Sequence, residues 1–215
     1  MKVLDLVFWL GTVDSLAAAF EKAEGRLCAL DGAIGDGDHG TSMLGGFREA
    51  QRSLRGVPVA DCGEVFRGIG RAFLENVGGV TGVVFGSAFD AAGESAAGLR
   101  ALDAEALCRA FASGLAAVKK RGRAAEGDKS MVDALSPAVE ALRISAGKGE
   151  SAGAALAQAA RSAEAGMKAT IPMEAKVGRG RYQPAKGAGH LDAGAASVCL
   201  LFQTISSAAA SRVSI

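Results

Sequence analysis

Apolar residues recur every three or four positions along most of this chain, a spacing typical of amphipathic helices. The first segment shows it at Leu4, Val7, Leu10, Val13 and Leu16, which predicts a helix over residues 2–24 that ends near Gly25. Aromatic residues are only 5% of the chain, and Ala and Leu dominate the apolar fraction. Both features favour helices over strands. The sequence therefore predicts an all-α fold.

The same spacing predicts seven further helices. We expect them over residues 39–54, 61–77, 80–97, 103–121, 129–146, 151–167 and from 192 onward, with residues 206–215 frayed. Predicted N-terminal caps are Asp61 with Glu64, Asp103, Asp128, Ser151 and Asp192. No strand, repeat or domain linker is expected. A chain of 215 residues can bury a substantial core, so residues 1–215 are predicted to form one domain.

Charge and cysteine content narrow the possible partners and location. The formal net charge is +1, which gives no reason to expect nucleic acid or an anionic membrane as a partner. Asp5 interrupts the apolar N-terminus, which disfavours a secretory signal, and we expect no uncharged run of the roughly 18 residues that a membrane span needs. The four cysteines form no C-x-x-C pair and are expected to be free thiols. We therefore predict a cytoplasmic protein.

Three carboxylates stand close together between the first two predicted helices. Asp31, Asp36 and Asp38 lie within eight positions, and no Lys or Arg falls between Arg26 and Arg48. Two carboxylates about 4 Å apart repel by roughly 4 kcal/mol at an effective dielectric near 20, so a folded cluster would take up protons or bind a cation. Oxygen ligands on a glycine-rich backbone favour Mg²⁺, ahead of Ca²⁺ if phosphate oxygens complete the shell.

The same segment partly matches two other nucleotide- or metal-binding motifs, and neither match is complete. Gly35, Gly37 and Gly40 match the G-x-G-x-x-G pattern, but the intervening aspartates would repel a pyrophosphate and no β-branched strand precedes them. An EF-hand loop beginning at Asp36 needs a Glu where Phe47 stands, and one beginning at Asp31 meets Ser42. An acidic, solvated loop that binds nothing remains the alternative.

Two further features point to a functional site, and the first of them favours an anion. Predicted helices begin after Asp38, Gly79, Gly127 and Leu191, and each start offers unpaired amides and a positive dipole end. If these starts converge beside the aspartates, they would form a Mg-nucleotide pocket. The segment from 170 to 191 is about twenty residues long, which is too long for a simple connector.

Four blocks of sequence resemble the nucleotide-binding L subunit of dihydroxyacetone kinases, in family order across almost the whole chain. They are residues 31–43, residues 78–86, residues 127–133, and residues 178–182 with 189–195. The resemblance implies an eight-helix antiparallel barrel with the nucleotide at one rim. It also implies that Asp31, Asp36 and Asp38 hold two Mg²⁺ ions that bridge the phosphates of ADP or ATP.

The resemblance further implies a set of nucleotide-contacting residues. They are His39, Gly40, Thr41, Ser42, Val80, Thr81, Gly122, Met131, Arg179, Asp192, Ala193 and Gly194. Arg179 would also act in catalysis with the three aspartates. This chain has Val80-Thr81 where relatives often have Ala-Ser, and Ala193 where they often have Pro, so these departures from the family pattern lie at the nucleotide rim rather than among the metal ligands. Residues 183–186 match least, which leaves the docking surface and the substrate open.

The activity implied is phosphoryl transfer to dihydroxyacetone or another small ketose. In this family a separate K subunit holds the sugar covalently through a histidine, so the two subunits must dock. Either ATP exchanges at each turnover, or bound ADP is rephosphorylated by a phosphotransferase-system protein. A homodimer is compatible with the resemblance. Two other function classes are compatible with a helical fold: a non-catalytic Mg-nucleotide sensor, and an interaction-only helical bundle, which would leave the three aspartates unexplained.

Overall fold

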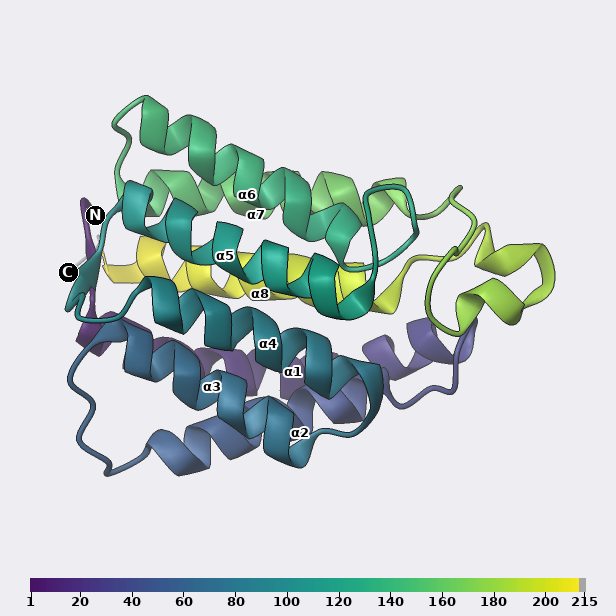
Figure 1. The fold of residues 1–215 in the computed structure, drawn as a ribbon, viewed down its shortest axis with the longest axis horizontal. Coiled ribbons are helices and arrows are strands. Elements are labelled where there is room, and N and C mark those ends of the chain that lie inside the picture. The colour runs from purple at the N-terminus through teal and green to yellow at the C-terminus, as the bar shows by residue number, and fades with distance from the viewer. Residues whose placement is uncertain (213–215) are drawn as a thin grey trace.

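The computed structural model describes residues 1–212, and this part of the chain is almost entirely helical (Figure 1). Its eight α-helices are α1 (Leu6–Gly32), α2 (His39–Leu54), α3 (Cys62–Asn76), α4 (Gly79–Ser95), α5 (Ala104–Gly122), α6 (Val132–Gly147), α7 (Ala152–Ala169) and α8 (Ala193–Ser211). Each helix packs against the next in sequence, and α8 returns to pack against α1. The ring is thereby closed, and the predicted all-α, eight-helix antiparallel barrel is confirmed.

The first helix differs from its prediction at both ends. It begins at Leu6, because Asp5 accepts a 2.7 Å hydrogen bond from the Phe8 amide and caps it. Strand β1 (Leu4–Asp5) pairs antiparallel with β2 (Ala101–Leu102), whereas no strand was predicted. The helix then passes through Gly25, where a glycine costs about 1 kcal/mol, and buries Leu27 before it ends at Gly32.

Most of the predicted caps are present. The carboxylates of Asp61, Asp103 and Asp192 and the Ser151 hydroxyl each accept from the amide three residues on. Glu64 reaches back and accepts from the Ala60 amide at 2.6 Å, one residue before the N-cap, in an arrangement related to the capping box. Asp128 is not a helix cap: it accepts from the Ala125 amide within a turn.

The sixth helix begins at Val132, not near residue 129 as predicted. Asp133 binds the free amides that precede it, accepting from Gly127 at 2.5 Å and from Ser130 at 2.8 Å. The amides before this helix are therefore bound by a carboxylate inside its first turn, whereas the cap was predicted at Asp128.

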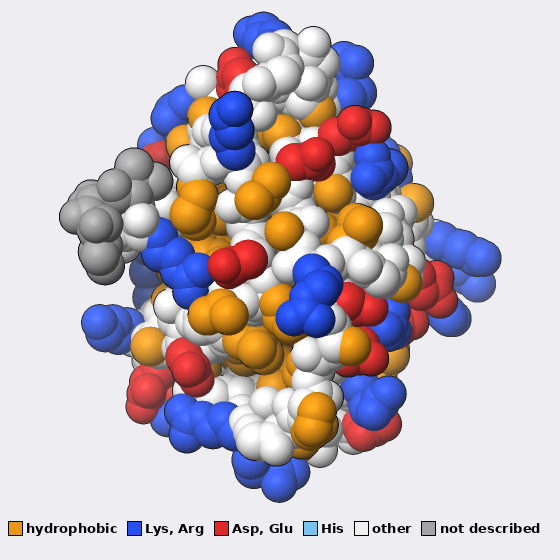
Figure 2. All heavy atoms as spheres, turned by 90° about the vertical axis from the view of Figure 1, so that its left-hand side faces the viewer, with side chains coloured by type: hydrophobic (Ala, Val, Ile, Leu, Met, Phe, Trp, Pro, Cys, Tyr) orange, Lys and Arg blue, Asp and Glu red, His pale blue; other side chains and the backbone are white. Residues whose placement is uncertain are grey.

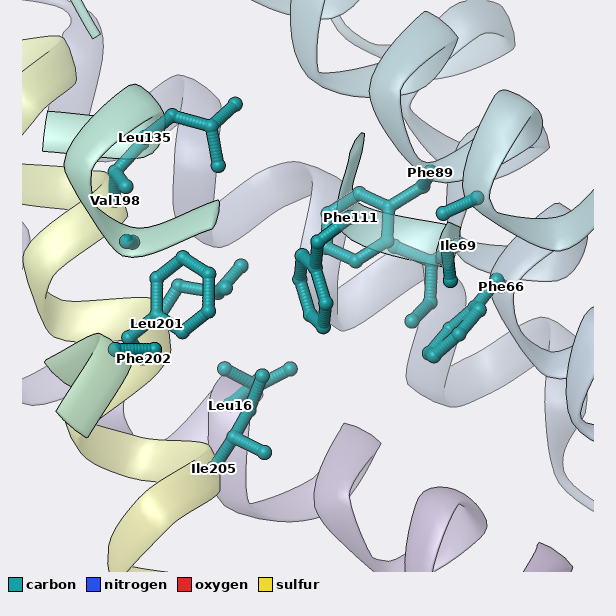
Figure 3. Close-up of a cluster of buried hydrophobic side chains, with 14 of the residues drawn as sticks. Leu16, Phe66, Ile69, Phe89, Phe111, Leu135, Val198, Leu201, Phe202 and Ile205 are labelled. Atoms are coloured by element: carbon teal, nitrogen blue, oxygen red, sulfur yellow. The ribbon is translucent and has the colours of Figure 1, made fainter. Parts of the chain in front are cut away.

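The core lies inside the barrel and is built from side chains of all eight helices. Figure 3 shows Leu16, Phe202 and Ile205 on one side of it, facing Phe66 and Ile69 across the barrel. The aromatic rings pack closely: the centroid of Phe111 is 4.9 Å from that of Phe202. Such contacts between aromatic side chains of different helices fix the spacing of the helices around the barrel.

The last helix corrects two predictions. Its residues Ala193–Ser211 carry no charge and are long and apolar enough, by length and composition, to cross a membrane, so the expectation of no such run is wrong. In this fold 56% of its most apolar window is buried, and it packs against α1, α6 and α7. The helix also continues through 206–211, which were predicted to fray; residues 213–215 lie outside the described part.

All four cysteines are free, as predicted. Burial raises the pKa of Cys62 and of Cys199 to about 11, so both stay protonated at neutral pH. The barrel end that carries β1 and β2 is shown in Figure 2: basic and acidic side chains are interspersed there, with apolar atoms between them. This mixture fits the formal net charge of +1.

Candidate functional site

The starts of the even-numbered helices meet at one rim of the barrel, because successive helices run antiparallel (Figure 1). His39 at the start of α2 lies with Nε2 2.8 Å from Ser197 Oγ in α8 and with Nδ1 3.5 Å from Thr81 Oγ1 in α4. A Cβ added to Gly194 in α8 would lie 3.3 Å from Met131 Cβ, at the start of α6. Four positive helix ends therefore surround one small region, which suits an anion.

The three aspartates of the connection between α1 and α2 lie at this same rim. One carboxylate oxygen from each of Asp31, Asp36 and Asp38 falls within 4.8 Å of the others. Asp31, in the last turn of α1, accepts from the amides of Gly37 at 2.8 Å and Asp38 at 3.1 Å, which folds the connection back on itself. Gly37 has a φ of +80°, a conformation that glycine adopts without strain.

The donor set fits a hard divalent cation. Asp38 is the N-cap residue of α2 by position, but its side chain makes no capping hydrogen bond. Asp31 uses one oxygen for backbone amides, so its other oxygen is free of these bonds. Three closely spaced carboxylates at a positive helix end are the oxygen-only ligands that Mg²⁺ and Ca²⁺ prefer.

The long segment between α7 and α8 folds over the aspartates and adds a cation. It contains two short 3-10 helices, η1 (Gly180–Tyr182) and η2 (Pro184–Gly187). The Arg179 guanidinium forms an ion pair with the Asp36 carboxylate. Gly187 rests on Ile34, where an added Cβ would lie 3.0 Å from Ile34 Cγ2. The segment thus brings Arg179 to the carboxylates from 143 residues away in sequence.

The first turn of α2 buries His39 and places Thr41 and Ser42 in hydrogen bonds with α1 and with Asp38. His39 is only 7% exposed, and burial lowers its pKa, with a partial opposing effect from Asp31 and Asp38; the imidazole is therefore neutral at pH 7. Thr41 donates to Glu24 Oε1 at 3.0 Å. Ser42 continues the helix by donating its amide to Asp38 O at 2.9 Å.

Gly40 lies against the backbone of α1. A Cβ at this position would lie 2.1 Å from Glu24 O, so glycine permits the close approach of α1 and α2. The packing of α1 against α2 therefore explains why residue 40 is a glycine, independently of any contact with a ligand.

Replacing Gly40 with Ala is expected to lower the free energy of unfolding by about 1–3 kcal/mol, because the new methyl group would overlap the α1 backbone. Gly45→Ala in the same helix is the matched control. Nothing lies within 4 Å of a Cβ there, so this change should stabilise by about 0.5–1 kcal/mol. Urea unfolding measures both variants. Equal stability of Gly40→Ala and wild type would contradict the contact.

The other predicted nucleotide contacts are arranged around the same rim. Thr81 faces His39, while Val80 beside it is 69% exposed at the start of α4. Gly122 ends α5, and a Cβ on it would lie 3.5 Å from Val84 of α4. Met131 and Ala193 are buried, at 7% and 5% exposure. Apart from Arg179, which reaches the rim from the segment between α7 and α8, the predicted set thus lies at helix ends of one rim.

Sequence reasoning missed three residues that build this rim. Lys129 is 2% exposed, and its Nζ donates at 2.5 Å to both Thr170 O and His190 O. Thr170 Oγ1 accepts from the Asp192 amide at 3.1 Å. Ser197 pairs with His39. For Lys129 the available signal was a lysine in a turn that follows Gly127. Thr170 and Ser197 carry no sequence signal.

Asp192 titrates in an unusual range. Burial raises its pKa from 3.8 to about 7; the Ala195 amide and Lys129 oppose this rise, while Asp133 and Asp31 add to it. Between these two pKa values the folded chain holds a proton that the unfolded chain has lost. Stability from this group is therefore complete below pH 3.8 and is lost as pH rises to about 7.

Asp192→Asn should remove this dependence while keeping an N-terminal cap, since Asn caps helices as well as Asp does. Its unfolding free energy relative to wild type should increase with pH between about 4 and 7, by up to about 4 kcal/mol. Urea titrations in EDTA across this range measure the difference. A difference that is constant with pH would show that Asp192 is not perturbed.

Comparison with known proteins identifies the family. A model of the DAK2 domain matches residues 33–207. The chain belongs to the DAK2 domain family. The ADP-binding subunit DhaL of the PEP-dependent dihydroxyacetone kinase of Escherichia coli strain K12 is 35% identical to this DAK2 chain over 204 residues, 95% of this chain and 96% of that subunit. The corresponding subunit of the PTS-dependent enzyme of Lactococcus lactis is 33% identical over 92% of this chain and 93% of that subunit.

Solved structures agree with this DAK2 assignment. The crystal structure of the dihydroxyacetone kinase of C. freundii with AMP-PNP and Mg²⁺ superimposes with a TM-score of 0.71 and 30% identity over 92% of this chain. This DAK2 chain spans only 33% of that kinase's length, and likewise 33% of a D-erythrulose kinase from Mycolicibacterium smegmatis that is 32% identical. The resemblance to the L subunit of dihydroxyacetone kinases is confirmed.

Proposed function

We propose that this chain is the nucleotide-binding subunit of a dihydroxyacetone-type kinase. It passes the terminal phosphoryl group of a Mg-bound adenine nucleotide to a hydroxyl group of dihydroxyacetone, or a similar small ketose, held by a partner K-type subunit. One observation carries the proposal: three carboxylates within 4.8 Å, the Arg179 guanidinium and four helix starts occupy the same rim. Carboxylates suit the cation, while the arginine and free amides suit the phosphates.

The metal ligands in this proposal are Asp31, Asp36 and Asp38, holding two Mg²⁺ ions. When bound, these ions would neutralise phosphate charge and hold the terminal phosphoryl group in line for transfer. Arg179 lies beside the same carboxylates, so its guanidinium can also donate to phosphate oxygens. The Arg179 guanidinium and the proposed metal site therefore share the Asp36 carboxylate and would act on the same phosphate groups.

The nucleotide itself would lie along the rim. His39, Gly40, Thr41 and Ser42 present the start of α2, Val80 and Thr81 the start of α4, and Asp192, Ala193 and Gly194 the start of α8. Gly122 and Met131 lie at the ends of α5 and α6 that border this region. The thioether of Met131 offers a polarisable apolar surface to an adenine ring.

In the transfer step, the bond between the terminal phosphorus and its bridging oxygen breaks and a bond to the ketose hydroxyl oxygen forms. The bridging oxygen stays with ADP on this chain, and the hydroxyl proton passes to a base of the partner subunit, which holds the sugar. This chain contributes position and charge rather than a covalent intermediate. It is therefore expected to be inactive without its partner.

For recharging, we propose that ADP stays bound and a phosphocarrier protein rephosphorylates it. The relatives that match along nearly their full length support this choice, since their names specify an ADP-binding subunit and PEP or PTS dependence. Acid extraction of the purified protein followed by chromatography tests it. Retained ADP at about one mole per mole supports the carrier route, and an empty site that turns over exchanging ATP contradicts it.

The decisive experiment combines the purified chain with a K-type subunit and dihydroxyacetone. Chain loaded with nucleotide that carries a labelled terminal phosphate should transfer the label to the ketose only when Mg²⁺ and the partner are present. Tight Mg-nucleotide binding without transfer would instead identify the non-catalytic sensor. The erythrulose kinases among the relatives make a four-carbon ketose the first alternative acceptor to test.

A further inference from the structure

A single buried ammonium group joins the two ends of the segment that carries Arg179. Lys129 is 2% exposed, and its Nζ lies 2.5 Å from Thr170 O and 2.5 Å from His190 O. Thr170 directly follows α7, and His190 lies two residues before the N-cap of α8. We call residues 171–189 between these two anchor points the Arg179 loop.

Backbone hydrogen bonds also connect the two sides of the Arg179 loop between its base and its tip. The Gly189 amide donates to Ile171 O at 2.7 Å, and the Ala175 amide donates to Lys186 O at 2.8 Å. At the tip, Arg179 pairs with Asp36. The Arg179 loop is thus fastened at its base by Lys129, crossed by backbone bonds, and held at its tip over the aspartates.

The position of Lys129 is unfavourable for a lysine in two respects. Its φ of +58° is in the left-handed region, which glycine adopts without strain and other residues do not. Burial also lowers the pKa of its ammonium group, an effect that Asp192 and Asp133 offset only in part. A glycine would relieve both costs but could not reach two carbonyl groups. The side chain, rather than the backbone conformation, explains a lysine here.

We infer that Lys129 is a positioning residue for phosphoryl transfer, because its ammonium group fastens both ends of the Arg179 loop and so holds Arg179 at the carboxylate cluster. The inference rests on the proposed function of Arg179. Without the ammonium group the two carbonyl oxygens lose their donor, and the loop ends separate more readily. Arg179 would then spend less time where phosphate oxygens bind.

A double-mutant cycle tests this inference through Mg-ADP affinity. Lys129→Met keeps the length of the side chain and removes its donors, and should weaken Mg-ADP binding by about tenfold. Arg179→Ala should weaken it by more. The double variant should bind no more weakly than Arg179→Ala alone, because Lys129 acts through Arg179. Additive losses would overturn the inference, since they would show that Lys129 affects binding independently of Arg179.

Lys176→Met is the matched control within the loop. Lys176 pairs with Asp128 at 3.4 Å on the surface, so this variant should bind Mg-ADP like wild type. Lys129→Arg keeps charged donors and should recover part of the affinity lost in Lys129→Met. Hydrogen exchange should accelerate in residues 171–189 of Lys129→Met while the helix cores stay protected. Exchange that accelerates everywhere would indicate general destabilisation and overturn the inference.

The outcomes also separate this inference from the proposed function. Wild-type affinity in Arg179→Ala would overturn the proposed role of Arg179, and this inference with it. Weakened binding in Arg179→Ala together with wild-type binding in Lys129→Met would overturn the inference alone. If Lys129→Met does not fold, Lys129→Gln takes its place in the cycle, since it keeps amide donors without the charge.

Discussion

Asp36→Asn should abolish phosphoryl transfer, with kcat of the complex reconstituted with a K-type subunit falling at least about 1,000-fold. The substitution keeps the shape of the side chain but removes one of the three carboxylates that lie within 4.8 Å of each other. It also removes the charge that holds Arg179 near the cluster. A metal site built from three carboxylates loses both a ligand and charge neutralisation in one change.

The fold should be unaffected by this substitution, because the Asp36 side chain is 35% exposed and binds no backbone amide in the described chain. The melting temperature in EDTA should match that of wild type. Asp14→Asn is the matched control: this exposed aspartate pairs with Arg55 and Gln51 on the surface and should leave turnover unchanged. Full turnover of Asp36→Asn would exclude the proposed metal role.

Arg179→Lys should lower kcat of the reconstituted complex by about 100-fold or more, although the charge is conserved. A guanidinium presents a planar set of donors that can contact a carboxylate and phosphate oxygens together. The ammonium group of lysine is a point charge at the end of a shorter side chain. The loss in kcat should exceed any loss of Mg-ADP affinity in this charge-conserving variant, since the arginine would also neutralise charge that develops during transfer. Steady-state kinetics at saturating ketose measure it.

Arg181→Lys supplies the comparison for this prediction. Arg181 lies in the same loop, but its guanidinium stacks over the Tyr182 ring at 4.6 Å instead of facing the aspartates. This variant should transfer phosphate at the wild-type rate if Arg179 alone serves the site. Equal losses in both variants would mean that the loop as a whole, rather than Arg179, determines the rate.

Local signals account for what the sequence predicted of the fold. Helix spacing and side-chain caps depend on residues three or four apart, so the eight helices and the caps Asp61, Asp103 and Asp192 were visible. The pairing of Leu4 with Leu102 was not visible, because two-residue strands show no periodicity. The start of α6 was misplaced because a cap was predicted at Asp128, whereas Asp133, inside the helix, binds the amides of Gly127 and Ser130 that precede it.

The residues of the candidate site also separate into those that local sequence predicted and those that it did not. Asp31, Asp36 and Asp38 were predictable as a cluster because eight positions of sequence contain them all. Arg179 was placed with them by family resemblance, since no local rule links residues 143 apart. The pairing of His39 with Ser197 spans 158 residues, and the two carbonyl groups bound by Lys129 belong to different ends of a loop. Such contacts exist only once the barrel has closed.

The polarity of the barrel has a practical consequence for measurement. The start of α1 and the end of α8 lie together at the end away from the aspartates, joined by an ion pair between Asp5 and Arg212 at 3.0 Å (Figure 1). An affinity tag or surface anchor attached at either of these points projects from the far end. Immobilised protein would then present its carboxylate rim to the solution, so that nucleotide and partner subunit can be supplied in turn on one biosensor surface.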